Sequence, residues 1–128
     1  MRVVRLLAEA AVLANLAHLK RHRVAPLYRS GVQYRNEPPG LPDECVDIPL
    51  LYRRGFGDCL HLSAARVAEL RAQGENASIK LKFAPATATQ GRVFHVLVRR
   101  GNGQLEDPSR ILGMGDRAVS LGLKKVGV

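Results

Sequence analysis

A single stretch of the sequence, residues 58–74, carries both the start and the stop signals of a helix. Asp58 suits the N-cap, an apolar-periodic run follows from Leu60 to Arg71, and Gly74 suits the position just past the helix end. Cys59 lies between the cap and the run, so the chain is predicted to place a thiol at a helix N-terminus. Because the helix dipole and the unpaired N–H groups of the first turn favour the thiolate, we expect a lowered thiol pKa.

The residues after this helix have the alternation of β-strands. Residues 76–83 alternate polar and apolar side chains, residues 92–99 form a second strand-like run, and residues 104–106 begin a third. Gly101-Asn102-Gly103 is a hairpin-type turn between the last two. With a helix predicted over residues 2–22, the order is helix, loops, helix and antiparallel meander, which is an α+β domain.

The N-terminal helix carries an apolar stripe. Its members fall on one side at helical spacing: Val3, Leu6, Leu7, Ala10, Leu13, Ala14 and Ala17. Charged residues gather on the opposite side: Arg2, Arg5, Glu9 and Lys20. We expect the stripe to pack in the core, and a partner groove is the alternative.

The length of 128 residues suits a single domain over residues 1–128. We divide this domain into an N-terminal helix (1–23), a loop-rich segment (24–54), a core that contains the candidate catalytic residues (55–114) and a C-terminal tail (115–128). Five prolines argue against long regular elements in the second segment: Pro26, Pro38, Pro39, Pro42 and Pro49. We expect this segment to lie beside the site and to form a wall that faces the substrate.

The composition limits the partners. The net charge is +9, so nucleic acid or an acidic protein fits the charge, although a basic surface alone specifies no ligand. Aromatic residues make up 5% of the chain, so we do not expect stacking on single-stranded nucleic acid, and phosphate contacts are the alternative. No membrane partner is expected, because charged and polar residues interrupt the best candidate span, Val3–Leu19.

The two cysteines, Cys45 and Cys59, make a poor disulfide framework, since a bridge between them would consume the candidate nucleophile. We therefore expect two free thiols in a reducing compartment. Acidic neighbours surround Cys45, so it is interpreted as an ordinary small side chain.

Cys59, His95 and Asp107 are together the groups that a thiol-dependent acyl-transfer site needs. His95 lies in the second strand-like run, and Asp107 follows the third, across the predicted turn. Adjacent antiparallel strands can present both side chains on one face. The alternative is a structural histidine followed by an ordinary Asp-Pro turn.

The combined blocks resemble a known family: Gly57-Asp58-Cys59, a helix ending at Gly74, Phe94-His95-Val96-Leu97-Val98 and Leu105-Glu106-Asp107-Pro108. They resemble the transglutaminase-like superfamily, and within it the small bacterial phage or prophage members with a papain-like catalytic core. The resemblance extends from about Gly31 to Met114. It implies an α+β fold in which the nucleophile begins a central helix packed on a small antiparallel sheet, with an extra N-terminal helix here.

The resemblance also implies roles for single residues. Cys59 would be the nucleophile, His95 the base and Asp107 the residue that orients it, in cleavage or transfer at an amide of a protein or peptide through a thioester acyl-enzyme. The Cys59 N–H is a natural oxyanion donor in such a fold. Gln33 and Tyr34 are candidates for a second donor.

The residues next to the thiol depart from the family pattern. Many relatives carry acidic residues just after the cysteine, some of them for calcium, but this chain has Leu60 and His61 there. Asp58 alone is a poor calcium site, so we expect no metal and no other cofactor. His61 is a candidate for tuning Cys59 or contacting substrate, and a polar position on the helix surface is the alternative.

Three functions follow as hypotheses. The first is a thiol-dependent hydrolase or acyltransferase, cytoplasmic or associated with a virion, whose substrate could be a phage structural protein. The second is a non-catalytic structural or binding component of a virion that retains the fold. The third is nucleic-acid binding through basic residues near the C-terminus: Arg99, Arg100, Arg110, Lys124 and Lys125.

Overall fold

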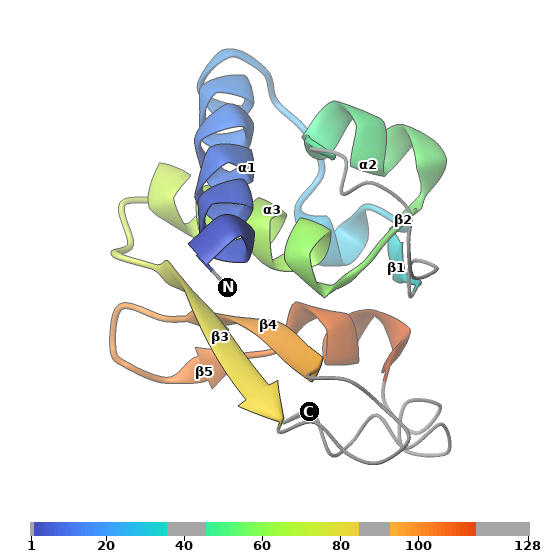
Figure 1. Ribbon diagram of the computed structural model, residues 1–128. Helices are drawn as coiled ribbons and strands as arrows, with labels where there is room; N and C mark the ends of the chain where they lie inside the picture. The colour runs from blue at the N-terminus through green and yellow to red at the C-terminus, as the bar shows by residue number, and fades with distance from the viewer. Residues whose placement is uncertain (1, 36–45, 85–92, 115–128) are drawn as a thin grey trace.

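The structure is a computed structural model that describes residues 2–35, 46–84 and 93–114. Its helices are α1 (Arg2–Arg21), α2 (Ile48–Arg54) and α3 (Cys59–Ala72), with short helical turns η1 (Leu27–Arg29) and η2 (Arg110–Met114). Its strands are β1 (Gln33–Tyr34), β2 (Phe56–Gly57), β3 (Ser78–Ala84), β4 (Val93–Arg99) and β5 (Leu105–Glu106). Strands β1 and β2 form a parallel pair, and β3, β4 and β5 form an antiparallel sheet in that order (Figure 1). The predicted mixture of helices and an antiparallel meander is confirmed.

The predicted hairpin is also confirmed. The Arg100 N–H donates to the Gln104 carbonyl at 2.7 Å, and the Gly103 N–H donates to the Arg100 carbonyl at 2.9 Å. Gly103 has φ +87°, a conformation that favours glycine. Other predictions fall outside the described residues: the C-terminal tail, Cys45, Pro38, Pro39 and Pro42.

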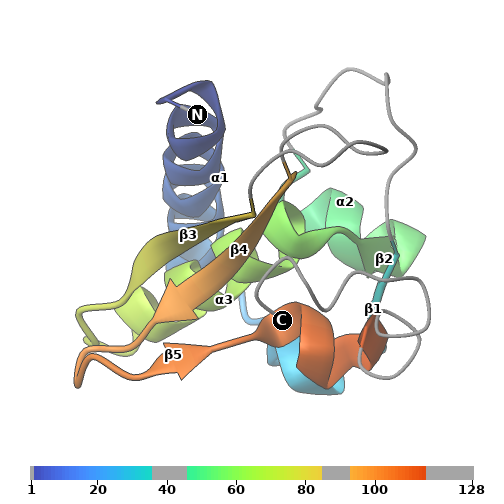
Figure 2. The ribbon, with the colours of Figure 1, turned by 60° about the horizontal axis from the view of Figure 1, so that its bottom comes forward.

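One face of the β3–β4 sheet packs against α1 and α3 (Figure 2). The cross-strand pairs Ile79–Val98 and Leu81–Val96 lie on this face and are buried. Side chains alternate along a strand, so His95 lies on the opposite face from Val96. The helices complete this core with small and medium side chains: Ala8, Ala11, Val12, Ala64, Val67, Ala68 and Leu70.

The prediction that the apolar stripe of α1 forms the core is wrong for most of its members. Six of them are exposed: Val3, Leu6, Ala10, Leu13, Ala14 and Ala17. The buried face instead carries Ala8, Ala11, Val12 and Asn15. Small side chains let α1 approach α3 closely, which leucines would prevent. Asn15 also fixes the helix rotation, because its Oδ1 accepts the Ile48 N–H at 2.8 Å in a buried position.

Sequence reasoning missed α2, which lies in the segment expected to lack long regular elements. Pro49 does not interrupt this helix, because it lies in the first turn, where no intrahelical partner awaits its missing N–H. The Asp47 side chain accepts the Leu50 N–H at 3.2 Å and caps the start, and Gly55 ends the helix with φ +79°. The buried Leu51 then packs in a second apolar cluster, between α2 and α3. Within the described residues, no helix combines the length and apolar character needed to cross a membrane.

The β1–β2 pair brings the residues before α3 beside Tyr34. Tyr34 pairs with Gly57, and the Arg35 N–H donates to the Gly57 carbonyl at 2.8 Å. Gly57 has no room for a side chain, because an added Cβ would lie 2.6 Å from Leu51 Cδ1 and 3.1 Å from His61 Cβ. Gly57 therefore lets α2, β2 and the start of α3 pack together.

Replacing Gly57 by alanine should destabilise the protein by about 1–3 kcal/mol, the usual effect of overpacking a buried site. Thermal unfolding followed by circular dichroism measures the change. Gly101→Ala is the matched control, since its added Cβ would lie 3.2 Å from Glu75 Cγ and at an ordinary contact distance of 3.6 Å from the Asn76 backbone. An unfolding midpoint of Gly57→Ala as high as that of the control would contradict the packing account.

Candidate active site

The first turn of α3 is capped as the sequence predicted. Asp58 Oδ1 accepts the Leu60 N–H at 3.0 Å and the His61 N–H at 3.1 Å. The His61 ring reaches back with Nδ1 3.4 Å from Asp58 N, which completes a capping box. His61 is only 5% exposed, so it does not lie on the helix surface. Within the described ranges, no residue accepts a hydrogen bond from the Cys59 N–H, which belongs to the first turn of the helix.

Two side chains of α3, Ser63 and Cys59, lie beside Val96 at one edge of β4. Among the described residues, strand β5 pairs only with Val98 and Arg99, and no strand pairs with this edge of β4 at Val96. The Ser63 hydroxyl donates to the Val96 carbonyl at 3.0 Å, and the Val96 N–H lies near enough to the Cys59 thiol to favour its ionised form. Cys59 and Ser63 are one helical turn apart, so α3 places the thiol against the residue that follows His95.

His95 and Asp107 meet beside this edge. His95 is 3% exposed, and its Nε2 lies 3.0 Å from Asp107 Oδ2. Asp107 Oδ1 also accepts the Arg110 N–H at 3.3 Å, so the carboxylate caps the turn that follows β5. An ionised carboxylate only accepts hydrogen bonds, so Nε2 of His95 carries a proton and Nδ1 of the neutral ring is the basic nitrogen.

The predicted lowering of the thiol pKa is wrong for this structure. Burial first, and then the nearby carboxylates of Asp58 and Asp107, raise the pKa of Cys59 to about 12 against the opposing effect of the Val96 and Leu60 N–H groups. Cys59 is therefore a protonated thiol at neutral pH. A reaction at this sulfur needs a base that removes the proton as the new bond forms.

The structure brings Tyr34 to the same place. Burial first, and then repulsion from the ionised forms of Cys59, Asp58 and Asp107, raise the pKa of Tyr34 to about 12. Tyr34 is half-buried, so its hydroxyl remains a candidate donor beside the thiol. Gln33 precedes it on β1, where its N–H donates to the Gly55 carbonyl at 3.0 Å, and Gln33 is exposed.

A consequence of the raised thiol pKa is a loss of stability at alkaline pH. In the unfolded chain the thiol ionises around pH 8.5, whereas the folded pKa is about 12, so the folded state retains a proton that the unfolded state loses. Stability should therefore fall as pH rises above 8.5. Between about pH 8.5 and 9.5, below the ordinary tyrosine pKa of about 10, the slope from Cys59 approaches 1.4 kcal/mol per pH unit.

Urea unfolding of Cys45→Ser against the double variant Cys45→Ser/Cys59→Ala measures this slope. Across this alkaline pH range, the free energy of unfolding should fall less in the Cys45→Ser/Cys59→Ala chain than in the Cys45→Ser chain. Equal slopes in the two chains would show that the thiol has an ordinary pKa in the folded protein.

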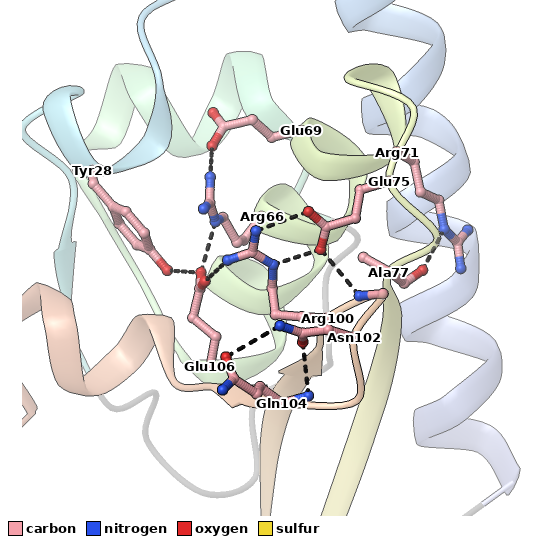
Figure 3. Close-up of polar contacts among 11 residues, drawn as sticks. Tyr28, Arg66, Glu69, Arg71, Glu75, Ala77, Arg100, Asn102, Gln104 and Glu106 are labelled. Carbon is pink, nitrogen blue, oxygen red and sulfur yellow. Dashed lines mark hydrogen bonds and ion pairs between the residues drawn. The ribbon is translucent and has the colours of Figure 1, made fainter.

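Glu106 positions its neighbour Asp107. Two guanidinium groups and one hydroxyl group donate hydrogen bonds to the Glu106 carboxylate (Figure 3). Glu106 Oε2 accepts from Arg66 Nε at 2.7 Å and from the Tyr28 hydroxyl, and Oε1 accepts from Arg100 Nη1 at 2.8 Å. Burial alone would raise the pKa of Glu106, but the hydrogen bonds from Arg66 and Tyr28 hold it below its ordinary value. The end of β5 is thereby fixed to α3.

Further carboxylates extend this network. Arg66 Nη1 donates to Glu69 Oε1 at 2.6 Å, and Glu69 Oε2 accepts the Leu27 N–H at 2.8 Å. Arg100 forms two hydrogen bonds to Glu75, at 2.5 and 2.8 Å. The network joins η1, α3 and the β4–β5 hairpin into one frame around the site.

The chain matches no protein-family model, no curated protein and no solved structure. Within the described ranges, no three His, Cys, Asp or Glu side chains gather in a way that could hold a metal ion. Sequence reasoning missed Ser63 and Glu106. The spacing of Ser63, one turn after Cys59, and the position of Glu106, next to Asp107, were the available signals.

Proposed function

We propose that the chain is a thiol-dependent hydrolase or acyltransferase that acts on an amide bond of a protein or peptide, with a papain-like core of the transglutaminase-like type. The proposal is supported above all by the convergence of Cys59 and Asp107 on the edge of β4 that carries His95. The thiol lies near the N–H of Val96, the residue after His95, and the His95–Asp107 contact of 3.0 Å leaves Nδ1 as the basic nitrogen.

The proposed reaction begins from the neutral thiol and the neutral imidazole. His95 Nδ1 takes the thiol proton as Cys59 Sγ attacks the amide carbonyl carbon, and Asp107 stabilises the imidazolium that forms. The Cys59 N–H stabilises the oxyanion, with the Tyr34 hydroxyl as a second donor. The C–N bond then breaks, the leaving amine takes the proton from His95, and a thioester remains on Cys59.

The second half-reaction releases the acyl group. Water or an amine attacks the thioester carbonyl while His95 accepts the proton of the attacking group, and the thiol is regenerated. Water gives hydrolysis and an amine gives acyl transfer. The resemblance of the Gly57-Asp58-Cys59 block and its partners to phage and prophage members supports a phage structural protein as the substrate.

The test uses p-nitrophenyl acetate, an activated ester that transfers its acetyl group to reactive thiols. Mass spectrometry of the Cys45→Ser chain should find one acetyl group on Cys59, with p-nitrophenolate released at a rate above that of the buffer, and the acetyl group should be lost again with time. The acetylation rate of Cys59 in the folded chain is compared with the rate in the same chain unfolded in urea. If the folded chain reacts no faster, the protein is a non-catalytic one that retains the fold.

A further inference from the structure

α1 carries an exposed apolar stripe on the side away from the core. Val3 is 68% exposed, Leu6 64% and Leu13 61%, and the exposed Ala10 and Ala17 complete the stripe. Successive members are three or four residues apart, the heptad spacing with which one helix packs along another. The opposite face of α1 is buried against α3 and the sheet (Figure 1). Among the described residues, only this inner face of α1 has a packing partner.

The composition of the stripe favours a helix over a bilayer as the occupant. Helices that lie in a membrane surface present large apolar side chains, often tryptophan or phenylalanine. Here alanines alternate with Leu6 and Leu13, and the stripe has no aromatic residue. Small residues between larger ones allow the backbone of a second helix to approach closely.

The charges around the stripe favour an acidic occupant. Arg5 is exposed near its beginning, and the exposed Lys20 and Arg21 lie one turn beyond Ala17. Glu9 lies 3.7 Å from Arg71, which offsets its charge. A second copy of the chain would bring basic ends together in either orientation, whereas carboxylates would complement them.

We propose that the outer face of α1 is a docking surface for an amphipathic helix of a partner protein whose flanking positions carry Asp and Glu. The surface is defined by Val3, Leu6, Ala10, Leu13 and Ala17. The candidate active site takes none of its residues from α1, so the proposal stands independently of the proposed function.

The test uses two synthetic three-heptad peptides as probes. Both have leucine and alanine at the a and d positions, and the flanking e and g positions are glutamate in one and lysine in the other. Fluorescence anisotropy at low salt should show the glutamate peptide binding at least about tenfold more tightly than the lysine peptide. The double variant Leu6→Gln/Leu13→Gln should lose at least about tenfold in affinity, and Lys20→Glu/Arg21→Glu should reverse the preference between the peptides.

The double variant Leu105→Gln/Ile111→Gln is the matched control, since these side chains are 44% and 55% exposed elsewhere on the protein. It should bind as the parent chain does. Equal binding of the two peptides, no binding of either, or binding unchanged by Leu6→Gln/Leu13→Gln would overturn the proposal. Two other results would also overturn the proposal if neither peptide bound. One is a dimer in sedimentation that Leu6→Gln/Leu13→Gln abolishes. The other is binding to phosphatidylglycerol vesicles that the same double variant abolishes.

Discussion

Replacing His95 by alanine should slow acetylation of Cys59 by p-nitrophenyl acetate by about a hundred- to ten-thousand-fold, the usual contribution of a positioned base. The effect is expected to be large because burial holds the pKa of Cys59 at about 12, so the thiol does not ionise unaided at neutral pH. Asp107→Asn should slow the reaction too, because an amide can donate a hydrogen bond to Nε2 and so favour the other imidazole tautomer.

His18→Ala is the control for the loss of an imidazole. His18 lies on α1 and stacks on His22, with ring centroids 4.6 Å apart, so its loss should leave the acetylation rate unchanged. Circular dichroism separates a loss of the fold from a loss of the base. Equal rates for folded His95→Ala and His18→Ala chains would remove His95 from the proposed mechanism.

Glu106→Gln should lower the free energy of unfolding by about 3 kcal/mol, because it removes the charge that accepts hydrogen bonds from Arg66, Arg100 and the Tyr28 hydroxyl and leaves Glu69 as the remaining carboxylate at Arg66. For a chain of this size such a change lowers the thermal midpoint by roughly 10 °C. Urea unfolding followed by circular dichroism measures it. Because Glu106 fixes the end of β5, the variant should also slow acetylation of Cys59 under conditions where it remains folded.

Glu9→Gln is the matched control for this network. Glu9 faces Arg71 at 3.7 Å with its side chain 43% exposed, so solvent already screens the pair. Its loss should change stability by less than about 0.5 kcal/mol. If Glu106→Gln lowers the free energy of unfolding as little as Glu9→Gln does, the network around Asp107 is an ordinary cluster of surface ion pairs.

The elements with local signals were predictable from the sequence. The N-cap at Asp58, the stop at Gly74 and the turn before Gln104 depend on neighbouring residues, and all three are present in the structure. Local patterns also identified Cys59, His95 and Asp107 as candidates. In the structure His95 Nε2 lies 3.0 Å from Asp107 Oδ2, and the joint action of the three residues stays a prediction.

The errors arose where contacts distant in the sequence decide the outcome. The stripe of α1 was the better apolar face by composition, but close approach to α3 and the bond between Asn15 and Ile48 turn another face inward. The helix dipole alone predicted a lowered thiol pKa, but the strand packed against Cys59 and the carboxylates of Asp58 and Asp107 raise it. Neither the depth of burial nor these neighbours can be read from the spacing of residues.

The pH dependence of iodoacetamide alkylation of Cys59 in the Cys45→Ser chain, with and without His95→Ala, tests the central claim most directly. We predict that around neutral pH the chain with His95 reacts much faster than the His95→Ala chain. In the His95→Ala chain, alkylation should become fast only well above the ordinary thiol pKa of about 8.5. Superimposable profiles for the two folded chains would contradict the claim that His95 serves Cys59 as its base.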